Sequence, residues 1–379
     1  MGCVDCRQNP FFFLDSTMRQ SMSEMQAIGA PVAIFLLSDL VDPPPSLLLL
    51  LRTVELAVFP NAWRLDAPTR SAIRAYIEPV VGTVLWVGAA GLLNETGHGQ
   101  THVASTTGIA QIMPCGAGGL DMPARTVTTR IANGSDPSDD PLLRAANGTV
   151  YGIGQPWYPD AAAFKLAPTF CFNESSYATA RARGGTVTVA VLGRYRDSTL
   201  QEASFVRATL PLDTESVGGQ PSRSSQTGGS CSTALAECWP VHADRAQCVA
   251  CEGQQQQRLI AAGCTEHDIK QYCSLTREVV WSSSPGLPRN VARAIAMRAG
   301  VHVFAGPDVQ VQLGATWLTV LNVNASSNAN GNAEQSVQVA LPHGVAQVVD
   351  ERKRIVCSHC SRWSVVLQRG ETRWFSFAA

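Results

Sequence analysis

The chain has 379 residues, of which 45% are hydrophobic, and its formal net charge is −1. A chain of this length can bury a full core and predicts two domains, with room for a small third. The nearly neutral charge and the dispersed Lys and Arg residues argue against a nucleic-acid partner. The ordinary apolar content argues against a disordered or fibrous protein.

The N-terminal part predicts a helix followed by a strand. Residues 15–29, DSTMRQSMSEMQAIG, place apolar side chains on one helical face, with Asp15 or Ser16 as N-cap. Residues 30–40, APVAIFLLSDL, are a continuous apolar run and predict a buried strand. The run Leu47–Leu51 is too short to cross a bilayer, so no membrane span is expected.

Apolar strands and an amphipathic helix then alternate. Residues 54–61, VELAVFPN, and 83–89, TVLWVGA, predict two strands. The helix predicted between them, LDAPTRSAIRAYIEPV, has Asp66 as its N-cap and Pro68 in its first turn. This alternation predicts an α/β fold with a parallel sheet and helices on both of its faces.

The rest of the chain predicts three kinds of structure in turn: loops, then strands and a helix, then antiparallel strands. Residues 94–160 are rich in Gly, Thr, Asn and Pro and predict loops. Strands are expected at 184–195 and 277–285, and a helix follows over 287–300, with Gly300 as its stop. After Gly300, apolar and polar residues alternate, which predicts a small antiparallel β-sandwich.

These patterns divide the chain into four segments. They are an α/β domain over 1–216, a cysteine-rich insertion over 217–274, the last strand and helix of the α/β domain over 275–300, and the β-sandwich over 301–379.

Cysteine usage predicts disulfide bonds. Six of the 12 cysteines crowd into the Gly-, Ser- and Gln-rich insertion, and two more form a CxxC pair between predicted strands of the tail, where a disulfide would brace a hairpin. A zinc site is the alternative, but an oxidising compartment removes thiolate ligands, so no metal site is predicted. The candidates are Cys231, Cys238, Cys248, Cys251, Cys264, Cys273, Cys357 and Cys360.

Five N-x-S/T sequons agree with a secreted or lumenal location. The start of the sequence, MGCVDCRQNPFFFLD, lacks the apolar stretch of a signal peptide, which leaves room for an N-terminus further upstream. The candidate glycosylation sites are Asn94, Asn133, Asn147, Asn173 and Asn324.

Several phrases together resemble a known arrangement: IGAPVAIFLLSDL, LAVFPNAWRLDAPTRSAIRAYI, TVLWVGAAGLL, TTGI and GLPRNVARAIAMRAGVHVF. They are similar to the β-galactosidase trimerisation domain of glycoside hydrolases, a flavodoxin-like relative of the class I glutamine amidotransferases. The tail, from ATWLTVLNVNAS to GETRWFSF, resembles the C-terminal sandwich of the same enzymes. The resemblance implies a flavodoxin-like fold, homo-oligomerisation, and a catalytic barrel that would lie upstream.

No catalytic residue or cofactor is predicted. In the amidotransferase relatives, the strand that TVLWV resembles leads to a nucleophilic Cys, but here Gly88, Ala89, Ala90 and Gly91 follow, and none can attack a carbonyl. The Asn94–Glu95 dipeptide matches the acid/base pair of many retaining glycosidases, but that chemistry needs a second carboxylate held on a barrel.

The resemblance therefore implies a non-catalytic scaffolding and oligomerisation region of a secreted, β-galactosidase-type glycoside hydrolase. One alternative is a free-standing carbohydrate- or protein-binding module that uses the cysteine-rich insertion, with Trp157, Tyr158 and Trp239 as possible sugar contacts. A third is an enzyme with an unrecognised site in the loop-rich residues 94–160.

Overall fold

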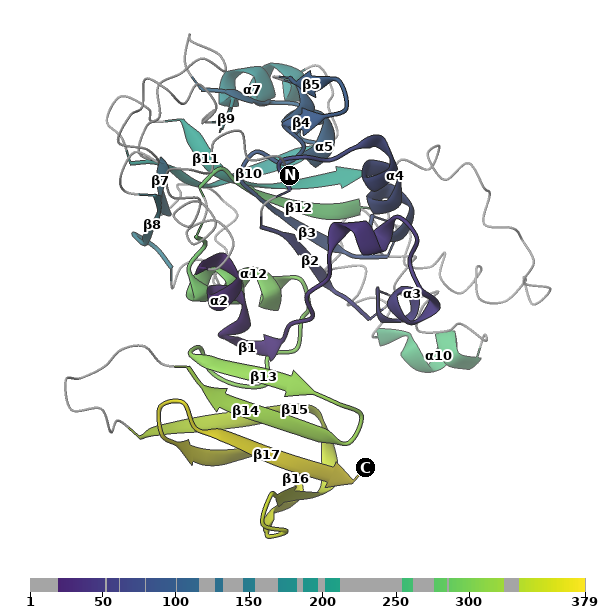
Figure 1. The fold of residues 1–379 in the computed structure, drawn as a ribbon, viewed down its shortest axis with the longest axis vertical. Helices are drawn as coiled ribbons and strands as arrows, with labels where there is room; N and C mark the ends of the chain where they lie inside the picture. The colour runs from purple at the N-terminus through teal and green to yellow at the C-terminus, as the bar shows by residue number, and fades with distance from the viewer. Residues whose placement is uncertain are drawn as a thin grey trace, which may run out of the picture.

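A computed structural model describes most of the sequence outside the cysteine-rich insertion, as two large sheets with helices packed around the first of them (Figure 1). The described residues are 20–51, 53–60, 62–78, 80–99, 101–115, 127–131, 146–153, 170–182, 187–196, 202–211, 254–261, 276–284, 286–323 and 334–378.

Within the described residues, the first sheet has nine strands and is mixed rather than parallel. Only its first three strands, β2, β3 and β12, run parallel to one another. The connection from β10 to β11 is short, and such a connection joins antiparallel strands. In sheet order the strands are β2 (Leu56–Phe59), β3 (Thr83–Val87), β12 (Thr276–Ser282), β11 (Ala203–Pro211), β10 (Thr188–Tyr195), β7 (Val127–Ile131) and β8 (Val150–Ile153), and β9 (Phe170–Phe172) joins β11 to β6 (Ile112–Pro114).

Helices cover both faces of the parallel strands, as predicted. On one face, Trp86 of β3 shares a core with Ile73 of α4 (Ala67–Tyr76) and with α3 (Pro45–Leu51). On the other face, Leu85 shares a core with Ile295 of α12 (Arg289–Arg298) and Met25 of α2 (Gln20–Gln26). Neighbouring strand residues point to opposite faces, so β3 contributes to both cores.

The predicted helix N-cap at Asp66 is confirmed. Its carboxylate Oδ1 accepts a hydrogen bond from the backbone N–H of Thr69 at 3.0 Å. This bond lowers the pKa of Asp66, because a hydrogen bond to the carboxylate favours its charged form. The other predicted caps, Asp15 and Ser16, lie outside the described residues.

The strand predicted over residues 30–40 is wrong. Only Ile28–Pro31 forms a strand, β1, and it pairs in parallel with β13 of the second sheet. Residues 32–36 have no regular structure and are exposed, and Leu37–Leu40 is a 3₁₀ helix, η2. An apolar run predicts burial only where another element covers it, and none of the described elements covers this one.

In the part of the chain that the structure describes, the second sheet has six strands and is antiparallel except for β1. The predicted antiparallel strands are confirmed, but they form one continuous sheet that curls over a single core. Val309 and Val320, from strands near one end of the strand order, share this core with Val339 and Trp363, from the two strands at the other end. The sheet order is β1, β13 (Val309–Leu313), β14 (Trp317–Asn322), β17 (Thr372–Ala378), β15 (Gln335–Asp350) and β16 (Ile355–Leu367).

Candidate functional site

The turn after β3 is packed tightly and consists of small residues. The backbone N–H of Gly88 donates to the carbonyl oxygen of Ser282 at 2.7 Å, and the indole Nε1–H of Trp281 donates to the carbonyl oxygen of Gly88 at 3.0 Å. Ala89 and Ala90 are buried. The turn thus presents no side chain beyond a methyl group where α/β enzymes usually place their reactive groups.

Seven hydroxyl side chains gather beside this turn, where β12 ends. We call them the hydroxyl cluster, and all are buried. Thr129 Oγ1 lies 2.8 Å from Ser204 Oγ and 2.7 Å from Ser284 Oγ. The members are Thr129, Tyr151, Tyr195, Ser204, Ser282, Ser283 and Ser284.

Two tyrosines complete the hydroxyl cluster. The Tyr151 hydroxyl lies 2.9 Å from Ser282 Oγ, and the Tyr195 hydroxyl donates to the carbonyl oxygen of Phe170 at 2.7 Å and contacts Ser283 Oγ. Each of the seven hydroxyls bonds to protein groups, so the cluster is a hydrogen-bonded core and offers no exposed nucleophile. The run Ser282–Ser284 at a strand end is the local sequence signal for this cluster, which was not among the predicted sites.

The hydroxyl cluster predicts a loss of stability at alkaline pH. Burial raises the pKa of both Tyr151 and Tyr195 in the folded chain. The unfolded chain therefore releases these protons first, above about pH 10, and stability falls by roughly 1.4 kcal/mol per pH unit for each tyrosine. Urea unfolding between pH 7 and 11 measures this slope.

The double variant Tyr151→Phe/Tyr195→Phe is the comparison for that slope. At pH 7 it should be less stable than the wild type, because the substitutions remove hydrogen bonds. Between pH 9.5 and 11, however, its stability should change less than that of the wild type. An equal slope in both proteins would contradict the assignment.

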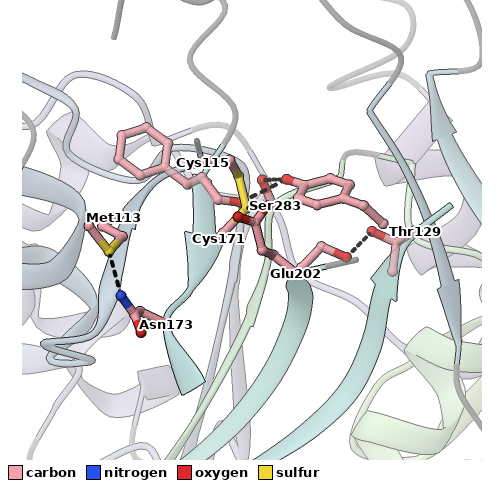
Figure 2. The surroundings of a disulfide bond; sticks show 10 residues. Met113, Cys115, Thr129, Cys171, Asn173, Glu202 and Ser283 are labelled. Carbon is pink, nitrogen blue, oxygen red and sulfur yellow. Dashed lines mark hydrogen bonds between the residues drawn. A yellow bond between two sulfur atoms is a disulfide. The ribbon is translucent and has the colours of Figure 1, made fainter. Parts of the chain in front are cut away.

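A disulfide between Cys115 and Cys171 lies next to the hydroxyl cluster (Figure 2). It joins the end of β6 to β9, and both cysteines are buried. Glu202 Oε2 lies 3.3 Å from Cys171 Sγ, and this carboxylate and the two sulfur atoms lie within 4.8 Å of one another. The metal ligand of cysteine is the thiolate, so the group would bind a metal only after reduction. This pair was not among the predicted disulfides, because its cysteines are 56 residues apart and no local pattern joins them.

The predicted site residues fall into three groups. The sulfur atoms of Cys357 and Cys360 are bonded within β16. Asn147 is exposed in a turn, whereas the side-chain Nδ2 atoms of Asn94 and Asn173 contact His102 and Met113. Outside the described residues lie Cys231, Cys238, Cys248, Cys251, Cys264, Cys273, Asn133, Asn324, Trp157, Tyr158 and Trp239.

Glu95 pairs with a cation on the surface. Its carboxylate Oε1 accepts a hydrogen bond from Arg70 Nη2 at 2.8 Å. Backbone hydrogen bonding, and after it this contact, lower the pKa of Glu95. A general acid requires the opposite shift, toward a raised pKa.

The surface feature that stands out is a set of exposed large apolar side chains from the end of β1 into α3, which we call the apolar ridge. Its most exposed members are Leu36, with 70% of its surface accessible, and Ile34, with 52%. Patches of this kind on a folded domain mark contact surfaces. The ridge consists of Val32, Ile34, Phe35, Leu36, Val41, Leu49 and Leu50.

A hollow of about 400 Å³ opens beside the apolar ridge. Apolar and acidic side chains line it together, because the 3₁₀ helix η2 and α3 meet here. Its lining residues are Phe35, Ser38, Asp39, Asp42, Pro44, Ser46, Leu47 and Leu50.

Comparison with protein-family models gave no match, and the search of curated proteins gave none either. In the described part of the chain, none of the helices is both long and apolar enough to span a membrane.

Proposed function

We propose that this chain is a non-catalytic scaffolding and oligomerisation region of a secreted protein of the β-galactosidase type. The observation that carries the proposal is the apolar ridge, because seven large apolar side chains exposed along 19 residues suit a surface covered by another protein. This stretch runs from Val32 to Leu50.

Two further features support a scaffolding role rather than a catalytic one. Gly88–Gly91 carries no nucleophilic side chain, and the neighbouring hydroxyl cluster is buried with its hydrogen bonds satisfied. The phrases that resemble the trimerisation domain include the parallel strands β2 and β3 and the helices α4 and α12 beside them. A flavodoxin-like relationship is part of the proposal, and β2, β3 and β12 are its support.

A secreted or lumenal location is likewise part of the proposal. Its support is the pair of disulfides in the described residues, Cys115–Cys171 and Cys357–Cys360, since disulfides persist mainly in oxidising compartments.

The proposal predicts that the whole chain associates with itself. Sedimentation velocity over a range of micromolar concentrations should show a species larger than the 40.4 kDa monomer. The double variant Ile34→Ser/Leu36→Ser should weaken this association at least tenfold, because it removes apolar area from the contact.

Val366→Ser is the matched control, since Val366 is a similarly exposed apolar residue far along the chain, and it should leave the association unchanged. A chain that stays monomeric at every concentration would contradict the proposed function. Binding of a monomeric chain to an immobilised glycan would favour the carbohydrate-binding alternative.

A further inference from the structure

A second exposed surface, on the last hairpin, has the opposite charge to the hollow beside the apolar ridge. The turn between β15 and β16 carries Arg352, Lys353 and Arg354, and the strand continues with Ile355 and Val356. All five are exposed, and Ile355 has 60% of its surface accessible. We call these five residues the basic hairpin.

Two of the three cations on the basic hairpin have no carboxylate partner among the described residues. Arg354 pairs with Asp350, whose Oδ2 lies 2.6 Å from Arg354 Nη2. The neighbouring Glu351 pairs with Arg373 at 2.7 Å. Arg352 and Lys353 form no ion pair with any residue that the structure describes, so their charges are available to a partner.

The hollow beside the apolar ridge has the complementary chemistry. Asp39 and Asp42 are its ionisable lining residues, and neither forms an ion pair within the described part of the chain. Phe35, Leu47 and Leu50 supply an apolar wall next to these carboxylates.

A Lys or Arg side chain suits such a hollow, because its aliphatic stem packs on apolar surface while its charged end reaches the acids. The aromatic ring of Phe35 also attracts a cation that lies over its face. Ile355 and Val356 would add apolar contact with the apolar ridge itself.

The two surfaces lie on different parts of the molecule, because α3, which carries part of the apolar ridge, packs on the first sheet, whereas the basic hairpin belongs to the second sheet. The apolar ridge directly follows β1, the first strand of the six-stranded sheet, and the basic hairpin begins β16, the last. Figure 1 shows the turn between β15 and β16 at the bottom of the molecule, whereas β1 and α3 lie nearer its middle. This arrangement favours a contact between two chains over one within a chain.

We propose that the basic hairpin of one protomer docks on the apolar ridge and the acidic hollow of a second copy of this chain. The inference rests on the proposed scaffolding role and identifies the partner and both contact surfaces. The contact is head to tail, so each protomer uses one surface toward each neighbour, and the rotation between neighbours sets whether the contacts close into a ring or continue as a filament.

Charge selects this arrangement over a symmetric one. Two apolar ridges facing each other would bring Asp39 and Asp42 toward the same acids, and two basic hairpins would oppose Arg352 and Lys353. Juxtaposed like charges at an interface cost several kcal/mol, whereas opposite charges steer and orient the partners.

Charge reversal on each surface, separately and together, tests the inference. The ridge variant is Asp39→Lys/Asp42→Lys and the hairpin variant is Arg352→Glu/Lys353→Glu. Each alone should raise the dissociation constant of the full chain roughly 100-fold, in line with the cost of opposed like charges. A chain that carries all four substitutions should recover most of the wild-type association.

Asp39 also has a local structural role, because its Oδ2 accepts a hydrogen bond from the backbone N–H of Leu36 at 3.1 Å. A second pair of variants therefore leaves Asp39 in place. One carries Asp42→Lys alone, and the other carries Asp42→Lys together with Arg352→Glu. Circular dichroism and thermal unfolding establish that each variant is folded before its association is measured.

The outcomes separate this inference from the proposed function. A wild-type chain that never associates overturns both. If the wild-type chain associates and the hairpin variant has the same dissociation constant, the head-to-tail contact is wrong. The scaffolding role is then unaffected. Weakening by either reversal, with recovery in the combined chain, supports the contact.

Discussion

Replacing Gly29 with alanine is expected to lower the free energy of unfolding by roughly 2 to 5 kcal/mol. Gly29 has φ +80°, in the left-handed region that costs an L-residue about 1 to 2 kcal/mol. A Cβ here would also overlap the carbonyl oxygen of Ala305 and lie 2.6 Å from that of Gly306, and overpacking adds typically about 1 to 3 kcal/mol.

Gly29 has this large effect because it lies where the two sheets meet. Its carbonyl oxygen accepts hydrogen bonds from the backbone N–H groups of Phe304 and Ala305, at 2.8 and 3.0 Å. The guanidinium of Arg293, on α12, donates to the carbonyl oxygens of Ile28 and Ala305, at 2.6 and 2.5 Å. A side chain at position 29 would force these groups apart.

Gly300→Ala is the matched control for Gly29→Ala. Gly300 has φ +88°, yet a Cβ there would meet nothing within 4 Å. Its replacement should cost only the backbone term, about 1 to 2 kcal/mol. Urea unfolding of the two variants beside the wild type measures the difference, and equal losses would mean that crowding at Gly29 has no effect.

Removing the disulfide between Cys115 and Cys171 is expected to destabilise the chain by about 4 kcal/mol, because the bond closes a long loop in the unfolded state. The two cysteines are 56 residues apart in the sequence. Cys115→Ala/Cys171→Ala also removes the covalent link between β6 and β9, so that backbone pairing alone holds β6 to β9, and β9 to β11 of the first sheet. Guanidinium unfolding under oxidising conditions measures the loss.

The bond between Cys357 and Cys360 supplies the control, since only 3 residues separate its ends. The same entropy relation gives about 2 kcal/mol for Cys357→Ala/Cys360→Ala. Under a reducing agent, the difference between the wild type and either double variant should shrink. A larger loss from the short loop than from the long one would contradict loop closure as the cause.

The basic hairpin and the apolar ridge connect these stability predictions to function. Gly29 and Arg293 hold β1 on α12 and the second sheet, and the apolar ridge begins at the next residue after β1. Weaker contacts between β1, α12 and the second sheet would therefore displace one docking surface relative to the other. Gly29→Ala should impair this association as well as folding.

Local patterns in the sequence determined many of the elements. Asp66 caps its helix because a carboxylate at that position accepts the bond from Thr69, a contact only three residues long. The period of 3.6 in residues 287–300 and the alternation in the tail likewise determined α12 and the antiparallel strands. These signals depend on neighbouring residues, so they do not need the rest of the fold.

The tertiary structure alone decided the features that join distant residues. The apolar run over residues 32–36 could not show that it would remain exposed, because burial depends on which elements come to lie over it. The hydroxyl cluster and the bond between Cys115 and Cys171 each bring together residues from several strands. Hydrophobicity determined which side chains favour a core, whereas contacts between distant strands decided which of them entered one.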